Sequence, residues 1–283
     1  MSGKNSDWLK IRYSNNNNTI KTTEILRELN LNTVCEEALC PNRWECFSKK
    51  TATFMILGKI CTRNCRFCNV EGGIPESPDQ AEALKVAEAV KKLGLKHVVI
   101  TSVTRDDLKD GGASAFAEVI IQIKKLKAEN PVTVEVLIPD FKGSFNALKT
   151  VVEQNPDILN HNLETVKELY HKVRPQADYH RSLELLENAK KINPKIITKS
   201  GIMVGLGEKK DEVVNLFKDL RKTGCDFITI GQYLSPSKNH LKVSEFVRPE
   251  VFKEYEEICR EMGFKFVQAA PLVRSSYHAA DFI

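Results

Sequence analysis

The segment Cys61-Thr62-Arg63-Asn64-Cys65-Arg66-Phe67-Cys68 follows an apolar run, Thr53–Leu57, that has the composition of a buried strand. Its cysteines are spaced C-x3-C-x2-C, and a second triplet, Cys35, Cys40 and Cys46, lies upstream with the spacing C-x4-C-x5-C. Six of the eight cysteines therefore fall within 34 residues. A cubane iron–sulfur cluster held by only three thiolates keeps one iron whose remaining site another ligand can fill. Two such triplets suggest two clusters with different roles.

From Thr53 onward, apolar β-type runs alternate with amphipathic helical stretches, the pattern of βα units around a parallel sheet. The expected strands cover 53–57, 97–103, 133–138, 158–160, 196–204 and 227–231, with a candidate final strand at 265–269. The expected helices cover 80–93, 113–129, 145–155, 183–192, 211–223 and 249–262. Six repeats are too few for a closed eight-stranded barrel. They predict an α/β fold with a partial (βα)6 TIM-like barrel, whose chemistry lies on loops after the strands.

Three parts follow along the chain. We expect residues 1–50 to form an N-terminal extension with a short helix near 22–29 and the first cysteine triplet. Residues 51–248 are the expected partial barrel, and residues 249–283 the expected C-terminal helix and extension.

The composition narrows the function classes. The chain has 283 residues, of which 42% are hydrophobic, enough for a proper core, and its net charge of +5 is small and scattered. Aromatic residues make up only 7%, and no aromatic and basic platform for nucleic acid is visible. No run approaches the ~18–20 apolar residues that cross a bilayer. The polar start of the chain does not resemble a secretory signal, so we expect a cytoplasmic protein whose clustered cysteines bind metal.

The second triplet allows two interpretations. Cys65 and Cys68 could form a C-x2-C zinc knuckle, but no matching pair of Cys or His lies downstream. The spacing C-x3-C-x2-C, with Phe67 directly before the last cysteine, resembles the signature of the radical S-adenosylmethionine superfamily. The resemblance implies that Cys61, Cys65 and Cys68 bind a [4Fe-4S] cluster whose fourth iron chelates S-adenosylmethionine. Phe67 is then a candidate cofactor contact.

Two later loops fit the same resemblance. Lys199–Glu208 is a strand that enters a glycine-rich turn, and its Ser200 is a candidate for the adenosine pocket. Asn162 and Glu164 close another strand with polar groups suited to the ribose or the methionine end. Without the resemblance, an ordinary turn explains these loops equally well. The superfamily's usual Gly-Gly-Glu is replaced here by the loop at 101–107, which leaves the amine contact unassigned.

The first triplet matches no common zinc or ferredoxin spacing. Taken with four longer stretches, it resembles the lipoyl synthase family over about residues 8–279. These stretches are Cys35-Glu36-Glu37-Ala38-Leu39-Cys40-Pro41-Asn42, Arg105-Asp106-Asp107-Leu108-Lys109-Asp110-Gly111-Gly112-Ala113, Asn160–Val166 and Arg274-Ser275-Ser276-Tyr277-His278-Ala279.

This resemblance implies a second, auxiliary [4Fe-4S] cluster on Cys35, Cys40 and Cys46. Its fourth ligand is carried over to Ser276, with Ser275 as the alternative, and Arg274 is expected to pair with a carboxylate or to assist cluster opening. A serine oxygen is a harder ligand than a thiolate, so it suits a cluster that is dismantled as a sulfur donor. Without the resemblance, these are ordinary surface residues. Cys225 and Cys259 are expected to be core or surface residues with no metal role.

The implied reaction inserts sulfur at C6 and C8 of an octanoyl chain bound to a carrier lysine. The implied partners are octanoylated carrier domains (2-oxoacid dehydrogenase E2 or glycine cleavage H protein), a ferredoxin or flavodoxin, and an iron–sulfur carrier for cluster repair. No nucleic acid or membrane partner is expected. Two alternatives remain: another sulfur-inserting radical enzyme, of the biotin-forming or methylthiolating kind, and a zinc-stabilised binding protein.

Overall fold

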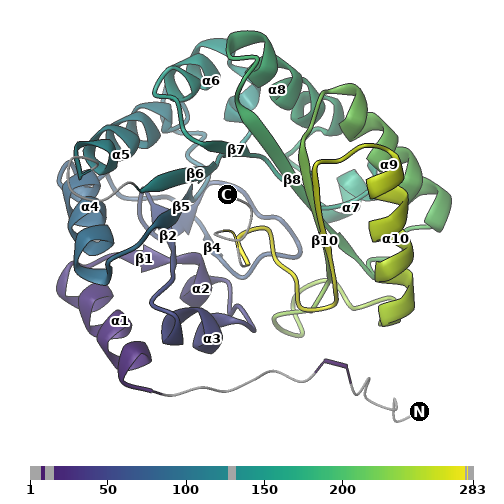
Figure 1. Ribbon diagram of the computed structural model, residues 1–283, viewed down its shortest axis with the longest axis horizontal. Coiled ribbons are helices and arrows are strands. Elements are labelled where there is room, and N and C mark those ends of the chain that lie inside the picture. The colour runs from purple at the N-terminus through teal and green to yellow at the C-terminus, as the bar shows by residue number, and fades with distance from the viewer. Residues whose placement is uncertain (1–7, 10–15, 127–131, 278, 280–283) are drawn as a thin grey trace.

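The computed structural model describes residues 8–9, 16–126, 132–277 and 279, and its centre is a curved sheet (Figure 1). The strand order is β1-β2-β5-β6-β7-β8-β9-β10. Only the β1 (Asn32–Thr33) edge pairs antiparallel, with β2. The other strands run parallel: β2 (Thr53–Ile56), β5 (His97–Ser102), β6 (Thr133–Leu137), β7 (Ile158–Asn160), β8 (Ile197–Val204), β9 (Phe227–Gln232) and β10 (Phe266–Ala269). Every strand expected from the sequence is therefore confirmed, including the last.

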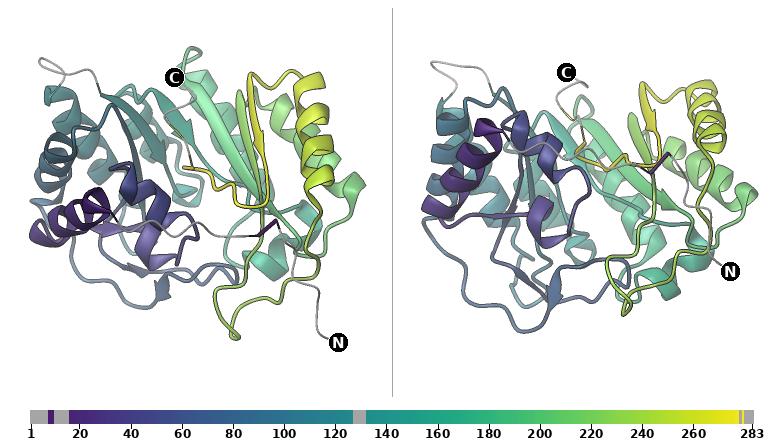
Figure 2. Two further views of the ribbon diagram at one scale, coloured as in Figure 1. Left: turned by 60° about the horizontal axis from the view of Figure 1, so that its bottom comes forward. Right: turned by 90° about the horizontal axis from the view of Figure 1, so that it is seen from below.

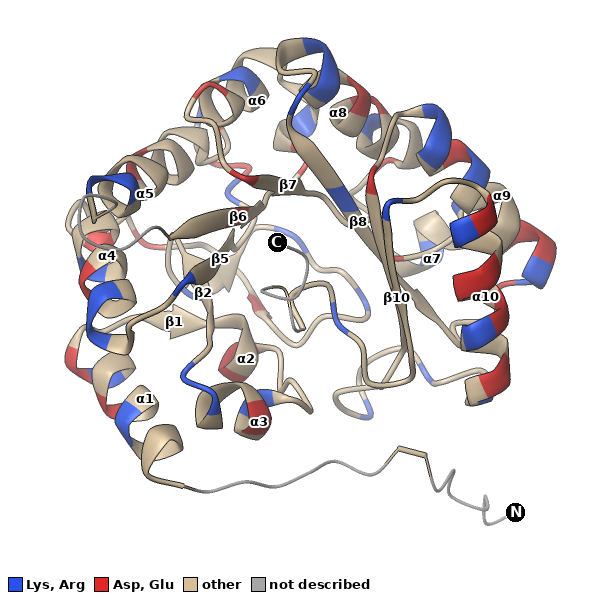
Figure 3. Ribbon diagram, in the orientation of Figure 1, with Lys and Arg blue, Asp and Glu red and all other residues tan. Residues whose placement is uncertain are grey.

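Helices cover the outer side of this sheet, while the loops after the strands gather on its inner side (Figure 1). They are α4 (Glu82–Leu93), α5 (Ala113–Lys125), α6 (Phe145–Val152), α8 (Tyr179–Ile192), α9 (Lys210–Lys222) and α10 (Pro249–Glu261). The last residues of the expected helix 113–129 lie outside the described ranges. Acidic and basic residues are interspersed along these helices (Figure 3). The strand order begins at β1 and ends at β10 without closing, which confirms a partial barrel.

The N-terminal part lies beside β2 at the open side of the barrel (Figure 1). Helix α1 (Asn17–Glu28) begins earlier than expected, because the Asn16 side chain caps it by accepting from the Thr19 N–H at 3.1 Å. Two shorter helices, α2 (Val34–Glu37) and α3 (Arg43–Ser48), follow. Within the ranges described, no helix is long and apolar enough to cross a bilayer.

The segment after β10 turns into the interior of the barrel, which Figure 2 shows from two further sides. We call residues 270–277 the C-terminal segment. The Gln232 N–H donates to the Pro271 carbonyl at 3.1 Å, so this segment crosses the end of β9. A Cβ atom on Gly231 would lie 2.1 Å from the Val273 carbonyl oxygen. Only glycine therefore allows so close a crossing.

An ion-pair cluster ties the N-terminal end of β9 to its neighbours. The Asp226 carboxylate accepts from Lys190 Nζ at 2.5 Å and from Lys265 Nζ at 2.8 Å, and it also accepts from the Thr198 N–H at 3.0 Å. Burial alone would raise the pKa of Asp226, but the hydrogen bonds from Lys190 and Lys265 lower it below its usual value. The cluster therefore stabilises the folded chain while Asp226 is ionised.

Asp226→Asn is expected to lower the free energy of unfolding at pH 7 by about 1–3 kcal/mol, because charged hydrogen bonds are lost in a buried place. Since the folded pKa is lowered, this stabilisation is present above the unfolded carboxyl pKa of ~3.9 and is lost as pH falls through the folded value. Urea unfolding of both proteins between pH 7 and pH 3 measures the difference. Glu256→Gln, which breaks the exposed 2.6 Å pair with Arg260, is the control, and an equal loss there would contradict the assignment.

Candidate active site

The second cysteine triplet lies on a loop that begins just after β2. Its ends are held together by a short parallel pairing of β3 (Ile60–Cys61) with β4 (Glu71–Gly72). Inside the loop, the Cys68 N–H donates to the Cys65 carbonyl at 3.0 Å. The backbone N–H groups of Arg63 and Thr104 lie 3.4 and 3.3 Å from Cys61 Sγ. The backbone therefore wraps the three thiols and directs N–H donors at one sulfur, an arrangement that tunes thiolate-bound clusters.

The thiols of this loop are close enough to interact. Burial raises the pKa of Cys68 to about 12, with contributions from the neighbouring Cys65 and Cys61. Burial likewise raises the pKa of Cys65. Because a metal ligand must be a thiolate, cluster binding here displaces protons.

The first triplet comes together in the N-terminal part. Cys35 is buried in α2, Cys40 lies on the following turn, and Cys46 is in α3. Burial raises the pKa of Cys46 to about 11, and the neighbouring Cys40 contributes. Burial also raises the pKa of Cys35, with contributions from Cys40 and Cys46. The three thiols are therefore neighbours in the fold.

Within the described part of the chain, no three His, Cys, Asp or Glu side chains stand close enough together to hold one metal ion. A cubane makes a different demand, because each of its irons takes its own thiolate and the three sulfurs do not converge on one atom. In both triplets the three thiols are close enough to affect one another's pKa, and the second adds N–H groups directed at one sulfur. This donor set fits a [4Fe-4S] cluster.

The C-terminal segment lies beside the first triplet. Asn42 Nδ2 donates to the Leu272 carbonyl at 2.7 Å, and the Tyr277 hydroxyl donates to Glu45 Oε2 at 3.0 Å. The Arg274 guanidinium is near enough to Cys40 to lower that thiol's pKa against the larger effect of burial. A turn closed by the Tyr277 N–H and the Arg274 carbonyl, 2.9 Å apart, carries Ser275 and Ser276. His278 lies outside the described residues.

Three of the four candidate cofactor contacts lie at β7 and β8: Asn162 and Glu164 follow the end of β7, and Ser200 lies within β8. Asn162 Nδ2 donates to Glu164 Oε1 at 3.0 Å, and Glu164 has a left-handed backbone with φ of 67°. Ser200 is fully buried, and its hydroxyl accepts from the Leu163 N–H at 3.2 Å, so Ser200 supports the loop. Phe67 packs against an apolar cluster of Val173, Leu206 and Tyr233 at the other side of the cysteine loop.

Arg174 was not anticipated from the sequence. It follows the short helix α7 (Tyr170–Val173), and its Nη1 donates to the Asn162 carbonyl at 2.8 Å. Burial raises the pKa of the nearby Cys65 thiol, and the positive charge of the Arg174 guanidinium partly offsets that rise. Arg174 Nε is buried without a partner. A buried donor between the cysteine loop and Asn162 marks a place suited to an anionic group. A lone arginine after a four-residue helix gives no periodic signal in the sequence.

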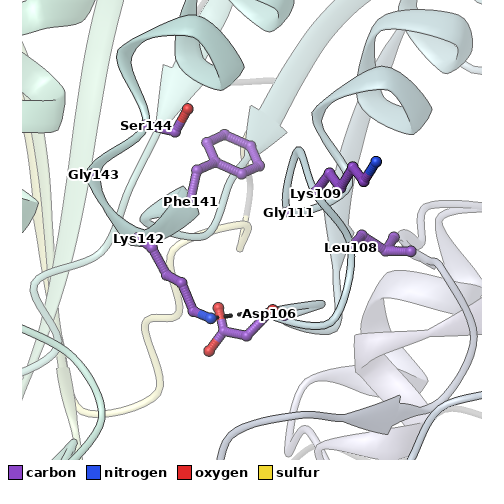
Figure 4. A pocket seen from close by; sticks show the side chains of 8 residues that line it. All are labelled: Asp106, Leu108, Lys109, Gly111, Phe141, Lys142, Gly143 and Ser144. Carbon is purple, nitrogen blue, oxygen red and sulfur yellow. Dashed lines mark hydrogen bonds between the residues drawn. The ribbon is translucent and has the colours of Figure 1, made fainter.

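Arg63 was also not anticipated, and it anchors the cysteine loop. Its side chain is almost completely buried and forms a two-pronged ion pair with Asp106 at 2.7 and 2.9 Å. It also contacts Asp140 Oδ1 at 2.6 Å, while Arg181 holds the other oxygen of Asp140 at 3.2 Å. Asp106 faces a cavity of 250 Å³ in which Lys142 Nζ donates to the Asp106 carbonyl at 3.1 Å (Figure 4).

The two triplets belong to neighbouring segments. Asn69, next to Cys68, donates through Nδ2 to the carbonyl of Glu37, which lies between Cys35 and Cys40, at 2.8 Å. Two thiol clusters, a buried arginine and an interior C-terminal segment thus meet at the inner side of the barrel. Of the two positions left open for Cys225 and Cys259, core or surface, the structure shows the core, because both are fully buried.

A family model described as the Radical SAM superfamily matches residues 55–220. Among solved structures, Streptococcus suis SuiB bound to S-adenosylmethionine is similar with a TM-score of 0.61 and 13% identity, over 89% of this chain and 61% of that one. HydG, a maturase of the [FeFe]-hydrogenase, is similar with a TM-score of 0.59 and 18% identity, over 76% and 50%. These likenesses show the fold. The chain belongs to the Radical SAM superfamily, and membership implies S-adenosylmethionine and a [4Fe-4S] cluster.

Closer relatives narrow the class. A protein named lipoyl synthase from Caldanaerobacter subterraneus subsp. tengcongensis is 58% identical over 280 residues, 99% of this chain and 97% of that one. Another from Caldicellulosiruptor bescii is 59% identical over 279 residues, 98% and 95% of the two chains. Within the superfamily, the chain belongs to the lipoyl synthase family.

Proposed function

We propose that this chain is a lipoyl synthase, which inserts sulfur at C6 and C8 of an octanoyl chain on a carrier lysine. The observation that supports this best is the contact between the two cysteine segments, Asn69 to Glu37, with the C-terminal segment beside the first triplet. A radical generated at the second triplet must reach an octanoyl chain that also reaches the sulfur held by the first triplet. One chain can reach both sites only if they lie close together, as the contact between the two cysteine segments supports.

Cys61, Cys65 and Cys68 would hold the [4Fe-4S] cluster that acts with S-adenosylmethionine. When bound, this cluster supplies the low-potential electron that cleaves S-adenosylmethionine into a hydrogen-abstracting radical. Asn162 and Glu164 present polar groups for the cofactor, and Ser200 holds their loop in place. Phe67 stiffens the cysteine loop through its apolar packing.

Cys35, Cys40, Cys46 and Ser276 would hold the second [4Fe-4S] cluster, which is consumed as the sulfur donor. The hydroxyl of Ser275 already accepts from Asn162 at 3.2 Å, and this favours Ser276 as the ligand. Arg274, near Cys40, offsets the negative charge of the thiolates and is placed to assist when the serine leaves. A hard oxygen ligand is released from an iron–sulfur centre more readily than a thiolate.

The three expected parts of the chain have separate roles in this proposal. Residues 1–50 carry the donor cluster, residues 51–248 generate the radical, and residues 249–283 supply the serine ligand. The substrate is an octanoylated carrier domain, of the 2-oxoacid dehydrogenase E2 or glycine cleavage H protein kind, whose tail gains about 0.8 kcal/mol per buried methylene. A ferredoxin or flavodoxin supplies electrons, and an iron–sulfur carrier rebuilds the spent cluster.

Anaerobic incubation with an octanoyl-lysine peptide, S-adenosylmethionine and dithionite tests the proposal. We expect mass spectrometry to find two added sulfur atoms, and fully loaded protein to contain about eight irons, as two four-iron clusters require. A methylthiolated product, a colourless zinc-containing protein or a lone four-iron centre at full loading would contradict it.

A further inference from the structure

We propose that Ser275 is a positioning residue for the S-adenosylmethionine side, so that the two neighbouring serines have different roles. Ser276 serves the first cysteine triplet, and Ser275 holds Asn162 and, through it, Glu164. This inference rests on the proposed function, because it assigns the cofactor side of the same site. It makes the C-terminal segment a structural link between the two clusters.

The hydrogen bonds of Asn162 show this link. The Nδ2 group of Asn162 donates both to Ser275 Oγ at 3.2 Å and to Glu164 Oε1 at 3.0 Å. The backbone carbonyl of Asn162 accepts from Arg174 Nη1 at 2.8 Å, and the carbonyl of the preceding Val173 accepts from the Arg66 N–H of the cysteine loop at 2.9 Å. A continuous set of contacts therefore runs from Ser275 to the cysteine loop.

The packing around Asn162 leaves little freedom. Asn162 is 9% exposed, and a Cβ atom built on Gly201 of β8 would lie 2.9 Å from Asn162 Oδ1 and 3.2 Å from Ser275 Cβ. The glycine lets both side chains sit directly on the strand. Asn162 Oδ1 is buried beside this glycine without a hydrogen-bond partner, so the orientation of the amide group depends on the two bonds that its Nδ2 donates to Ser275 and Glu164.

The same C-terminal segment is held at the first triplet by other residues. Leu272 accepts from Asn42, Tyr277 donates to Glu45 on α3, and Arg274 is near both Cys40 and Glu164. Ser275 and Ser276 share the turn closed by Arg274 and Tyr277. Ser275 therefore makes the hydrogen bond from this turn to Asn162, and removal of its hydroxyl breaks that bond while the contacts at the first triplet remain.

The test measures cofactor binding apart from catalysis. Ser275→Ala, in anaerobically loaded protein, is expected to weaken S-adenosylmethionine binding about 3- to 10-fold, the effect of one neutral hydrogen bond. Equilibrium dialysis with labelled S-adenosylmethionine gives the affinity. Iron content and the Mössbauer spectrum of the first cluster are expected to stay unchanged in this variant. Ser276→Ala is expected to change that spectrum and to leave the affinity within about twofold.

Ser235→Ala is the basal control, because its hydroxyl donates to the Ser237 carbonyl on an exposed loop, and wild-type affinity and spectra are expected. Wild-type affinity in Ser275→Ala, or a changed first-cluster spectrum in that variant, would overturn the inference. The proposed function fails separately, if the wild-type protein forms no doubly sulfurated product. Loss of iron from both sites in Ser275→Ala would show that Ser275 has only a structural role, and it would also overturn the inference about Ser275.

Discussion

Cys65→Ala is expected to abolish both cleavage of S-adenosylmethionine and lipoyl formation, whereas Cys40→Ala is expected to retain cleavage and to lose lipoyl formation. Cys65 lies in the wrapped loop after β2, with Arg174 nearby, and cannot be replaced by a neighbouring thiol within that loop. Cys40 lies at the other triplet, beside Arg274. Mass spectrometry of 5′-deoxyadenosine and of the peptide product, from one reaction, separates the two losses.

The matched controls are Cys225→Ala and Cys259→Ala. Both thiols are fully buried in the core away from the triplets, so their loss is expected to cost stability and to leave both products. Iron content is expected to fall by about half in either triplet variant and to stay unchanged in the controls. Lipoyl formation by Cys40→Ala would refute the donor role of the first triplet.

The strands and long helices were predictable because each carries a strong local pattern. The strand β5, for example, contains the buried apolar run Val98–Ile100, and α9 has one apolar face. The short helices α2 and α3 have four and six residues, too few for a periodic signal, and they were missed. Their positions follow from tertiary contacts, such as the Thr22 hydroxyl donating to the Phe47 carbonyl at 3.2 Å.

The cysteine ligands were predictable because their spacing is local, but the arrangement around them was not. The bonds from Asn42 to Leu272 and from Tyr277 to Glu45 join residues about 230 positions apart. Such pairs form only where the folded barrel has space for the C-terminal segment, as at Gly231. The sequence alone does not show where that space is. The split between Ser275 and Ser276 likewise depends on which hydroxyl faces Asn162.

The ion pairs of Arg63 that anchor the cysteine loop were also not predicted from the sequence, and their removal is expected to have the second large effect. Burial alone would raise the pKa of Asp140, but hydrogen bonds and charge from Arg63 hold that pKa well below its usual range. Asp140 thus remains an ionised group whose side chain is 0% exposed. The charge of Arg63 is in turn divided between Asp140 and Asp106. The loop of the second triplet is joined to the ends of β5 and β6 by these pairs.

Arg63→Met is therefore expected to lower the free energy of unfolding of the cluster-free chain by about 3–5 kcal/mol, the cost of removing one partner from a buried ion pair. Iron retention at the second triplet is expected to fall as well, because the loop loses its attachment. Urea unfolding and iron content after loading measure the two effects. Arg66→Met is the matched control in the same loop, since that side chain is exposed, and a change within about 0.5 kcal/mol is expected.

A second variant separates the charge from the packing. If the orphaned carboxylate of Asp140 causes the loss, Arg63→Met combined with Asp140→Asn is expected to recover part of the stability, because a neutral amide costs less to bury than an unpaired carboxylate. Iron retention is not expected to recover in the double variant, since neither replacement restores the bond between the cysteine loop and β6. Equal stability of Arg63→Met and Arg66→Met would contradict the anchoring role. Full iron retention in Arg63→Met would show that the short pairing of β3 with β4 holds the loop by itself.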